Sequence, residues 1–220
     1  MESTLDAVGE AGLQFFAKMT ASISHELKNA LAVINESAGL LEDFTLMAER
    51  GAPMDPGRIR ALAGTVKDRV RRADGIVKNM NRFAHSIDEP VRTVDPGEVL
   101  GFVAALSGRL LSMGGATLQW ASPAGEVTIA TIPFLLQCLL WRCLKFAADS
   151  AGAGKTVSLS AEKSRTGARI GFAGIQGSQG GKGEGFPGRQ EKALLGALRA
   201  ELRFDAGTGE IVVSLPRDIG

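Results

Sequence analysis

Two long amphipathic patterns follow each other in the first part of the sequence and constrain the fold more than any other feature. Apolar or small residues recur every three or four positions over 16–41, and again over 59–84, as expected for one face of a helix. A break at 49–53 separates the patterns, and Asp55 with Pro56 supplies an N-cap followed by proline at the first helical position. The sequence therefore predicts two long helices joined by a short loop as an antiparallel hairpin.

A lone helical hairpin leaves half of its apolar surface in water, and a second copy would cover that surface. The natural product of two such hairpins is a four-helix bundle. We therefore expect a homodimer through residues of about 14–88.

The remaining chain alternates between helix and strand patterns. Asp95 and Pro96 begin an amphipathic helix that extends to Met113. Predicted strands are 117–121, 127–130, 156–161, 169–173 and 210–215, and predicted helices are 133–148 and 190–202. A Ser-Pro-Ala-Gly turn at 122–125 predicts a hairpin, and the Gly-rich tract 174–188 predicts a mobile loop. We expect an α+β protein, with the helical hairpin in 1–90 and an α/β sandwich in 91–220.

Composition excludes several classes of protein. The 220 residues are 45% hydrophobic and 22% charged with a net charge of +1, which indicates a soluble globular protein and supports neither disorder nor a general nucleic-acid or membrane binder. The apolar stretch 129–148 is interrupted by Gln137, Arg142 and Lys145, so it predicts a core helix instead of a membrane span. The acidic N-terminus lacks the features of a signal peptide, which predicts a cytoplasmic protein.

The two cysteines, Cys138 and Cys143, lie five apart in the apolar helix. This spacing suits neither a disulfide framework nor a zinc site with its paired short spacings. We expect both to be buried free thiols.

His25 lies inside the first predicted helix but off its apolar stripe, so it should face solvent. Asn29 lies about 40° and Glu26 about 100° around the helix from His25, so the three polar groups share one exposed sector. An exposed imidazole beside a carboxylate can be deprotonated and can attack phosphorus, while an amide can orient a water molecule. These three are the candidate catalytic residues. The alternative is a histidine that lies by chance on a solvated helix face.

The segment around His25 resembles the phosphoacceptor motif of sensor histidine kinases. In that family a Ser-His-Glu-Leu-Lys/Arg-Asn/Thr-Pro-Leu run lies on the first helix of a dimerisation hairpin. Residues 24–29 and Leu31 match, Ala30 stands where proline is usual, and a phenylalanine precedes the histidine. The hairpin and the α/β domain after it extend the resemblance over nearly the whole chain. The resemblance implies that His25 is a phosphoacceptor.

By the same resemblance, the second domain should have the ATP-binding sandwich of these kinases. That fold holds Mg-ATP through two asparagines four apart on a helix, an Asp-x-Gly-x-Gly turn and a Gly-x-Gly-Leu-Gly segment. Trp141 and Lys145 stand where the asparagines would be, and strand 169–173 leads into Gly174 without a carboxylate. The later helix opens at Arg189 without the glycines that let backbone approach phosphate. We therefore predict that ATP binding is lost, with no cofactor and no metal.

These features together predict a histidine phosphotransferase that passes phosphoryl groups to or from receiver-domain aspartates of response regulators through His25. The alternatives are a response-regulator phosphatase in which Asn29 positions water, a pseudokinase scaffold, and a sensor histidine kinase with divergent ATP contacts. The second helix is rich in basic side chains, which either steer an acidic receiver or solvate the bundle. They are Arg58, Arg60, Lys67, Arg69, Arg71, Arg72, Lys78 and Arg82. His85 is expected to act as a cation at the helix C-terminus.

Overall fold

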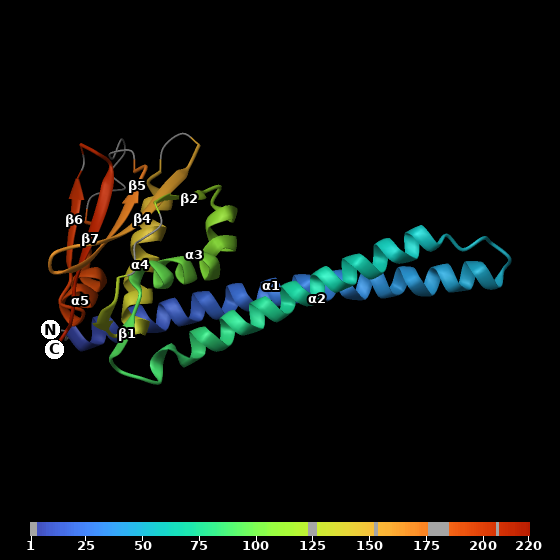
Figure 1. Ribbon diagram of the computed structural model, residues 1–220, viewed down its shortest axis with the longest axis horizontal. Coiled ribbons are helices and arrows are strands. Elements are labelled where there is room, and N and C mark those ends of the chain that lie inside the picture. The colour runs from blue at the N-terminus through green and yellow to red at the C-terminus, as the bar shows by residue number, and fades with distance from the viewer. Residues whose placement is uncertain (1–3, 123–126, 152–153, 176–184, 206) are drawn as a thin grey trace. The chain divides into compact units, whose positions relative to one another are not determined.

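The computed structural model describes residues 4–122, 127–151, 154–175, 185–205 and 207–220 (Figure 1). The chain divides into two compact units. One unit is Thr20–Ala84, and the other combines Met1–Met19 with His85–Gly220. The hairpin domain predicted from the sequence spans 1–90, whereas the described part of Met1–Met19 packs with the sheet-containing unit.

The hairpin unit contains two long helices joined by a short turn, as predicted. Helix α1 (Thr4–Glu49) continues into this unit, and α2 (Pro56–Ala84) returns beside it (Figure 1). In the turn, the amide of Ala52 donates to the Met47 carbonyl at 3.1 Å. The Asp55 carboxylate accepts from the Gly57 amide at 2.8 Å, so the predicted N-cap of α2 is present.

The buried face of α1 only partly coincides with the apolar stripe predicted from the sequence. Ile23 and Ala30 are buried, but Phe16, Thr20 and Ala38 are exposed. Residues of the predicted stripe on α2, which the structure describes throughout, are all half-buried or exposed in the single chain. A large part of the apolar surface of the hairpin therefore remains accessible.

The second unit is built on a five-stranded sheet of order β2-β4-β5-β7-β6. Its strands are β2 (Thr117–Ser122), β4 (Thr156–Lys163), β5 (Gly167–Ala173), β6 (Glu201–Asp205) and β7 (Glu210–Pro216). Only the β2–β4 pairing is parallel among these described strands. A separate two-stranded sheet pairs β1 (Arg92–Val94) with β3 (Ile129–Thr131). A short 3₁₀ helix, η1 (His85–Ile87), begins this part of the chain.

Three helices complete this unit: α3 (Pro96–Met113), α4 (Pro133–Asp149) and α5 (Arg189–Ala197). Helices α3 and α4 pack together and against β4 and β5. The strands β4 and β7 alternate buried and half-buried residues, as expected for a sheet with one covered face. The Asp95 carboxylate caps α3 by accepting from the amides of Gly97 and Glu98 at 2.7 and 3.2 Å. The α+β class predicted from the sequence is confirmed.

Two details of the prediction for this unit are wrong. The helix expected over 190–202 ends at Ala197, because the chain turns and enters the edge strand β6 at Glu201. The expected hairpin at 122–125 does not form, since β2 pairs with β4 in one sheet and β3 pairs with β1 in another. Residues 123–126 of that turn, and 176–184 of the tract expected to be a mobile loop, lie outside the described residues.

Helix α4 forms the centre of the core of this unit. Leu136, Leu139, Leu140 and Leu144 are fully buried, which explains the apolar run in the sequence. Across the described parts of the chain, no helix has the length and apolarity needed to cross a bilayer. Cys138 and Cys143 are buried and free, as predicted.

Candidate functional site

The His25 side chain is exposed on α1, within the hairpin unit. Its neighbours Ile23 and Ala30 are buried and fix the face of the helix that turns inward. Asn29 is also exposed, one turn after His25, so the two side chains lie on one accessible sector as expected. Among the described residues, none forms a hydrogen bond or ion pair with the His25 imidazole. The ring is therefore accessible to a reactant from solvent.

Glu26 points in another direction and is bound across the hairpin. Nη2 of Arg72 on α2 donates to Oε2 of Glu26 at 3.3 Å. The Glu26 side chain is only 19% exposed, whereas that of Arg72 is 59% exposed. The antiparallel register thus places Arg72 at the height of His25 on the neighbouring helix. Sequence reasoning found Arg72 only as one member of a basic surface and missed this pairing.

The second histidine, His85, lies in η1 at the start of the sheet-containing unit. Its Nδ1 lies 2.6 Å from Oδ2 of Asp88, and both side chains are exposed. The imidazole of His85 therefore has a carboxylate partner, which distinguishes it from the imidazole of His25.

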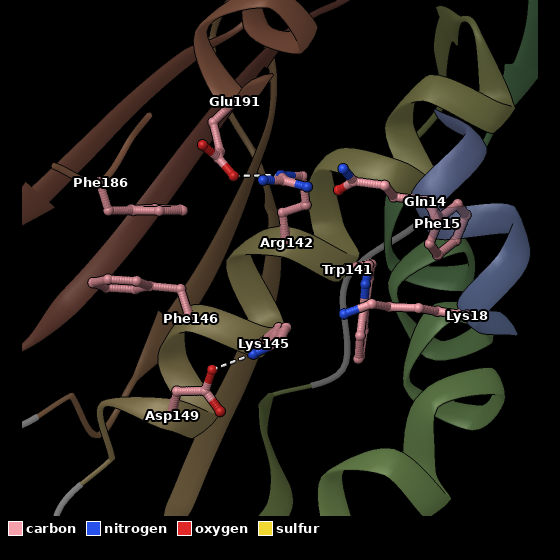
Figure 2. A pocket seen from close by; sticks show the side chains of 10 residues that line it. All are labelled: Gln14, Phe15, Lys18, Trp141, Arg142, Lys145, Phe146, Asp149, Phe186 and Glu191. Atoms are coloured by element: carbon pink, nitrogen blue, oxygen red, sulfur yellow. Dashed lines mark hydrogen bonds and ion pairs between the residues drawn. The ribbon is translucent and has the colours of Figure 1, made fainter. Parts of the chain in front are cut away.

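An open pocket of about 310 Å³ lies beside α4 in the sheet-containing unit (Figure 2). Phe146 and Phe186 stack at one wall, with ring centroids 4.1 Å apart and planes 12° from parallel. Two ion pairs lie beside the stack, Arg142 with Glu191 and Lys145 with Asp149 (Figure 2). The pocket is lined by Gln14, Phe15, Lys18, Trp141, Arg142, Lys145, Phe146, Asp149, Phe186 and Glu191.

Both residues that replace the expected asparagines line this pocket. Trp141 presents an indole, which has no acceptor oxygen, and the Lys145 ammonium is paired with Asp149. Magnesium prefers oxygen ligands, and neither side chain supplies one.

Gly174 directly follows β5, at the position where the sensor histidine kinases that the sequence resembles have a carboxylate. It adopts φ +101°, and a Cβ atom there would lie 2.3 Å from the Thr156 carbonyl oxygen. Backbone of this conformation in this space accepts only glycine. The position therefore has no room for an aspartate in the present backbone.

The N-terminus of α5 is closed by an acidic side chain of the helix itself. Oε2 of Glu191 accepts from the Gly188 amide at 2.9 Å, and the Glu191 residue is 6% exposed. A carboxylate at a helix N-terminus satisfies the dipole and the free amides that would otherwise attract a phosphate. Within the described residues, no group of three or more His, Cys, Asp or Glu side chains is placed to hold a metal ion.

Burial sets the chemistry of the two cysteines. It raises the pKa of the Cys138 thiol from 9.0 to about 12. It also raises the pKa of Cys143 far above its ordinary value. The Sγ of Cys138 donates to the Ala11 carbonyl at 3.4 Å. Both thiols therefore stay protonated and serve packing instead of nucleophilic chemistry.

No protein-family model and no curated protein matches the sequence. Among solved structures, the chain is similar to the histidine kinase AdeS of Acinetobacter baumannii, with 11% identity, 88% of this chain and 98% of that chain covered, and a TM-score of 0.48. It is similar to the histidine kinase ThkA in complex with the response regulator TrrA, with 13% identity, 93% and 63% covered, and a TM-score of 0.48. It is also similar to a bacterial phosphotransferase, with 16% identity, 97% of each chain covered, and a TM-score of 0.44. At such identities, function has to be inferred from the residues of the chain itself.

Proposed function

We propose that the chain is a histidine phosphotransferase of a two-component phosphorelay, which passes phosphoryl groups between receiver-domain aspartates through His25. The observation that carries the proposal is the exposed His25 imidazole, which no described residue engages and which has Glu26 as its neighbour in the sequence. A free imidazole nitrogen is a nucleophile towards phosphorus at neutral pH. The resemblance of residues 24–31 to a phosphoacceptor motif supports this specific chemistry.

The proposed step is a simple exchange of bonds. A ring nitrogen of His25 attacks the phosphorus of an aspartyl phosphate, the acyl P–O bond breaks, and the aspartate leaves as a carboxylate. The reverse step returns the phosphoryl group to another receiver. This chemistry needs no nucleotide site in the chain. The sheet-containing unit is consistent with a reaction that uses no nucleotide, because neither magnesium ligands nor a carboxylate for adenine is supplied by Trp141, Lys145 and Gly174.

The proposed partner is the acidic phosphorylation pocket of a response-regulator receiver domain. Helix α2 carries exposed basic side chains, including Arg58, Lys67 and Arg72, against only Asp68 and Asp74 in the same helix. Complementary charge of this kind raises the rate of encounter with an acidic surface. The accessible apolar side chains of the same hairpin support the proposal that two copies associate there.

Asn29 favours one second candidate, a phosphatase that removes phosphate from a response regulator. Its exposed amide lies one turn from His25 and can hold a water molecule beside a docked aspartyl phosphate. In that reaction His25 would not itself carry the phosphoryl group.

The two candidates can be tested by following a labelled phosphoryl group. Receiver domains of the source organism are each phosphorylated with ³²P-acetyl phosphate, freed of donor, and incubated with the full chain or its His25→Ala variant. Transfer predicts acid-labile label on the wild-type chain and none on the variant. Release of free phosphate without labelling of the chain would favour the phosphatase. No transfer and no release with any receiver would overturn both reactions and favour a scaffold.

A further inference from the structure

We propose that Arg72 is a positioning residue that holds the Glu26 carboxylate away from His25. When a receiver domain docks, its acidic pocket binds Arg72 in place of Glu26 and so releases the Glu26 carboxylate. This proposal rests on the proposed function, because it assigns a regulation to the phosphoacceptor site. It concerns when His25 becomes reactive.

The geometry separates Glu26 from the imidazole in the free chain. The Glu26 side chain is 19% exposed and is bound to Arg72 of the other helix at 3.3 Å, whereas the His25 side chain faces solvent. Consecutive residues on a helix point about 100° apart, which fits these two environments. A carboxylate that is bound to a guanidinium and turned towards α2 is not in place to accept the imidazole proton.

The geometry of the ion pair allows Arg72 to exchange Glu26 for another anionic partner. Arg72 contacts one carboxylate oxygen through one nitrogen, and its side chain remains 59% exposed. Guanidinium has five N–H donors and prefers two-point binding to carboxylate or phosphate. A single contact at 3.3 Å that leaves the Arg72 side chain largely in solvent is a weak attachment for the guanidinium. A receiver that brings a phosphoryl group and several carboxylates to His25 therefore offers Arg72 better partners than Glu26.

Release of Glu26 would change the chemistry at the ring. When one imidazole nitrogen attacks phosphorus, the other ring nitrogen must lose its proton to leave a phosphohistidine with an uncharged ring. A freed Glu26 carboxylate can swing towards the ring and accept that proton. A positioned base contributes roughly 10²–10⁴-fold in rate.

The test uses ³²P-phosphoramidate, a small donor that brings no carboxylate to Arg72. The imidazole attacks phosphorus, the P–N bond of the donor breaks, and ammonia leaves. We expect Arg72→Gln to raise the initial rate of labelling of His25 roughly tenfold, part of the range available to a positioned base. Arg72→Lys should retain the wild-type rate, since its ammonium can still bind Glu26. On a Glu26→Gln background, Arg72→Gln should have no effect.

A matched control lies in the sheet-containing unit. Arg169 is 57% exposed and pairs with Glu162 at 3.8 Å, so Arg169→Gln removes a similar surface ion pair and should leave the rate unchanged. Circular dichroism of each variant should show that its helical content is retained. At saturating phosphorylated receiver, wild type and Arg72→Gln should differ little in kcat, while Arg72→Gln raises KM.

The outcomes separate the two proposals. An Arg72→Gln rate with phosphoramidate within twofold of wild type, or below it, overturns the gating role while His25-dependent labelling leaves the phosphotransferase intact. Equal labelling of wild type and His25→Ala instead overturns the assignment of His25 as carrier.

Discussion

Phe146 and Phe186 stack face to face beside α4, with ring centroids 4.1 Å apart. Phe186 lies two residues before Gly188, the N-cap of α5, so the stack ties the start of α5 to α4. This intramolecular contact between two aromatic side chains thus forms one wall of the pocket.

We predict that Mg-ATP does not bind usefully to this pocket. Each missing charge-assisted contact to magnesium or adenine removes roughly 1.5–3 kcal/mol, and the combined loss moves a micromolar site beyond the millimolar range. Isothermal titration calorimetry of the full chain should give no dissociation constant below about 100 μM. A tighter constant, or labelling of His25 from γ-³²P-ATP, would contradict the prediction and favour a divergent kinase.

Gly174 should tolerate no side chain. An added Cβ would lie 2.3 Å from the Thr156 carbonyl oxygen in a backbone with φ +101°, so Gly174→Asp forces β4 and β5 apart and does not restore ATP binding. We expect a loss of stability of about 1–3 kcal/mol, measured by urea unfolding. Gly196→Ala is the control, because nothing lies within 4 Å of its Cβ position. Equal stability of the two variants would be inconsistent with this account.

The hairpin should mediate dimerisation. Leu31 is 53% and Val70 is 52% exposed, and burial of such apolar surface against a second copy favours association. Light scattering at tens of micromolar should give a dimer for the wild type, and Val70→Glu should shift it towards monomer. Met113, 71% exposed on α3, gives the control substitution Met113→Glu, which should remain dimeric. A monodisperse wild-type monomer would contradict the prediction.

Alkaline pH should destabilise the protein through its two buried thiols. Burial raises the pKa of Cys138 from 9.0 to about 12 and raises that of Cys143 in the same direction. The folded state therefore keeps its thiols protonated while the unfolded state ionises above about pH 9, so stability is retained below that pH and lost as pH rises through the folded-state pKa. Each thiol contributes up to about 1.4 kcal/mol per pH unit in that window.

The measurement is the free energy of unfolding at several pH values between 8 and about 10, where other groups contribute less. The Cys138→Ala/Cys143→Ala variant should show a shallower decrease with pH than the wild type, whatever its absolute stability. Equal slopes would mean that the thiols ionise equally in both states.

Substitutions of His25, Glu26 and Asn29 should differ in their effects on phosphoryl transfer. Glu26→Gln should slow transfer from a phosphorylated receiver by roughly 10²–10⁴-fold if its carboxylate acts as base or orients the ring. Asn29→Ala should change transfer little, because a phosphotransferase needs no positioned water. Strong loss of regulator dephosphorylation in Asn29→Ala, with dephosphorylation retained in His25→Ala, would instead identify a phosphatase.

The helices were predictable where the pattern was long and the caps were specific. Asp55-Pro56 and Asp95-Pro96 marked the starts of α2 and α3 because both devices act locally. The inward face of α1 was harder to predict, since Phe15 and Phe16 are equally apolar and only packing decides that Phe15 is buried. Strand β6 was missed because Leu202 continued the apolar spacing of α5.

The sequence predicted which residues of the candidate site are exposed on α1, but not the ion pair that links the site to α2. Exposure of His25 and Asn29 follows from helical periodicity, which is a local property. The Glu26–Arg72 ion pair joins residues 46 positions apart, and its register depends on the turn between α1 and α2. A single sequence contains no signal for that register, so Arg72 could be recognised only as a positive charge.

The sheet-containing unit is built from two separate segments of the chain, which limits how recombination could transfer it between genes. Ala11 accepts a hydrogen bond from Cys138, and Phe15 contacts the ring of Phe134 at a centroid distance of 5.9 Å, so part of the core of this unit comes from the start of the chain. Recombination that moves the coding segment for 85–220 as one block would deliver the sheet without the helical segment that covers α4. Inheritance of this unit as a working module therefore requires both of its segments, with the hairpin carried between them as an insertion.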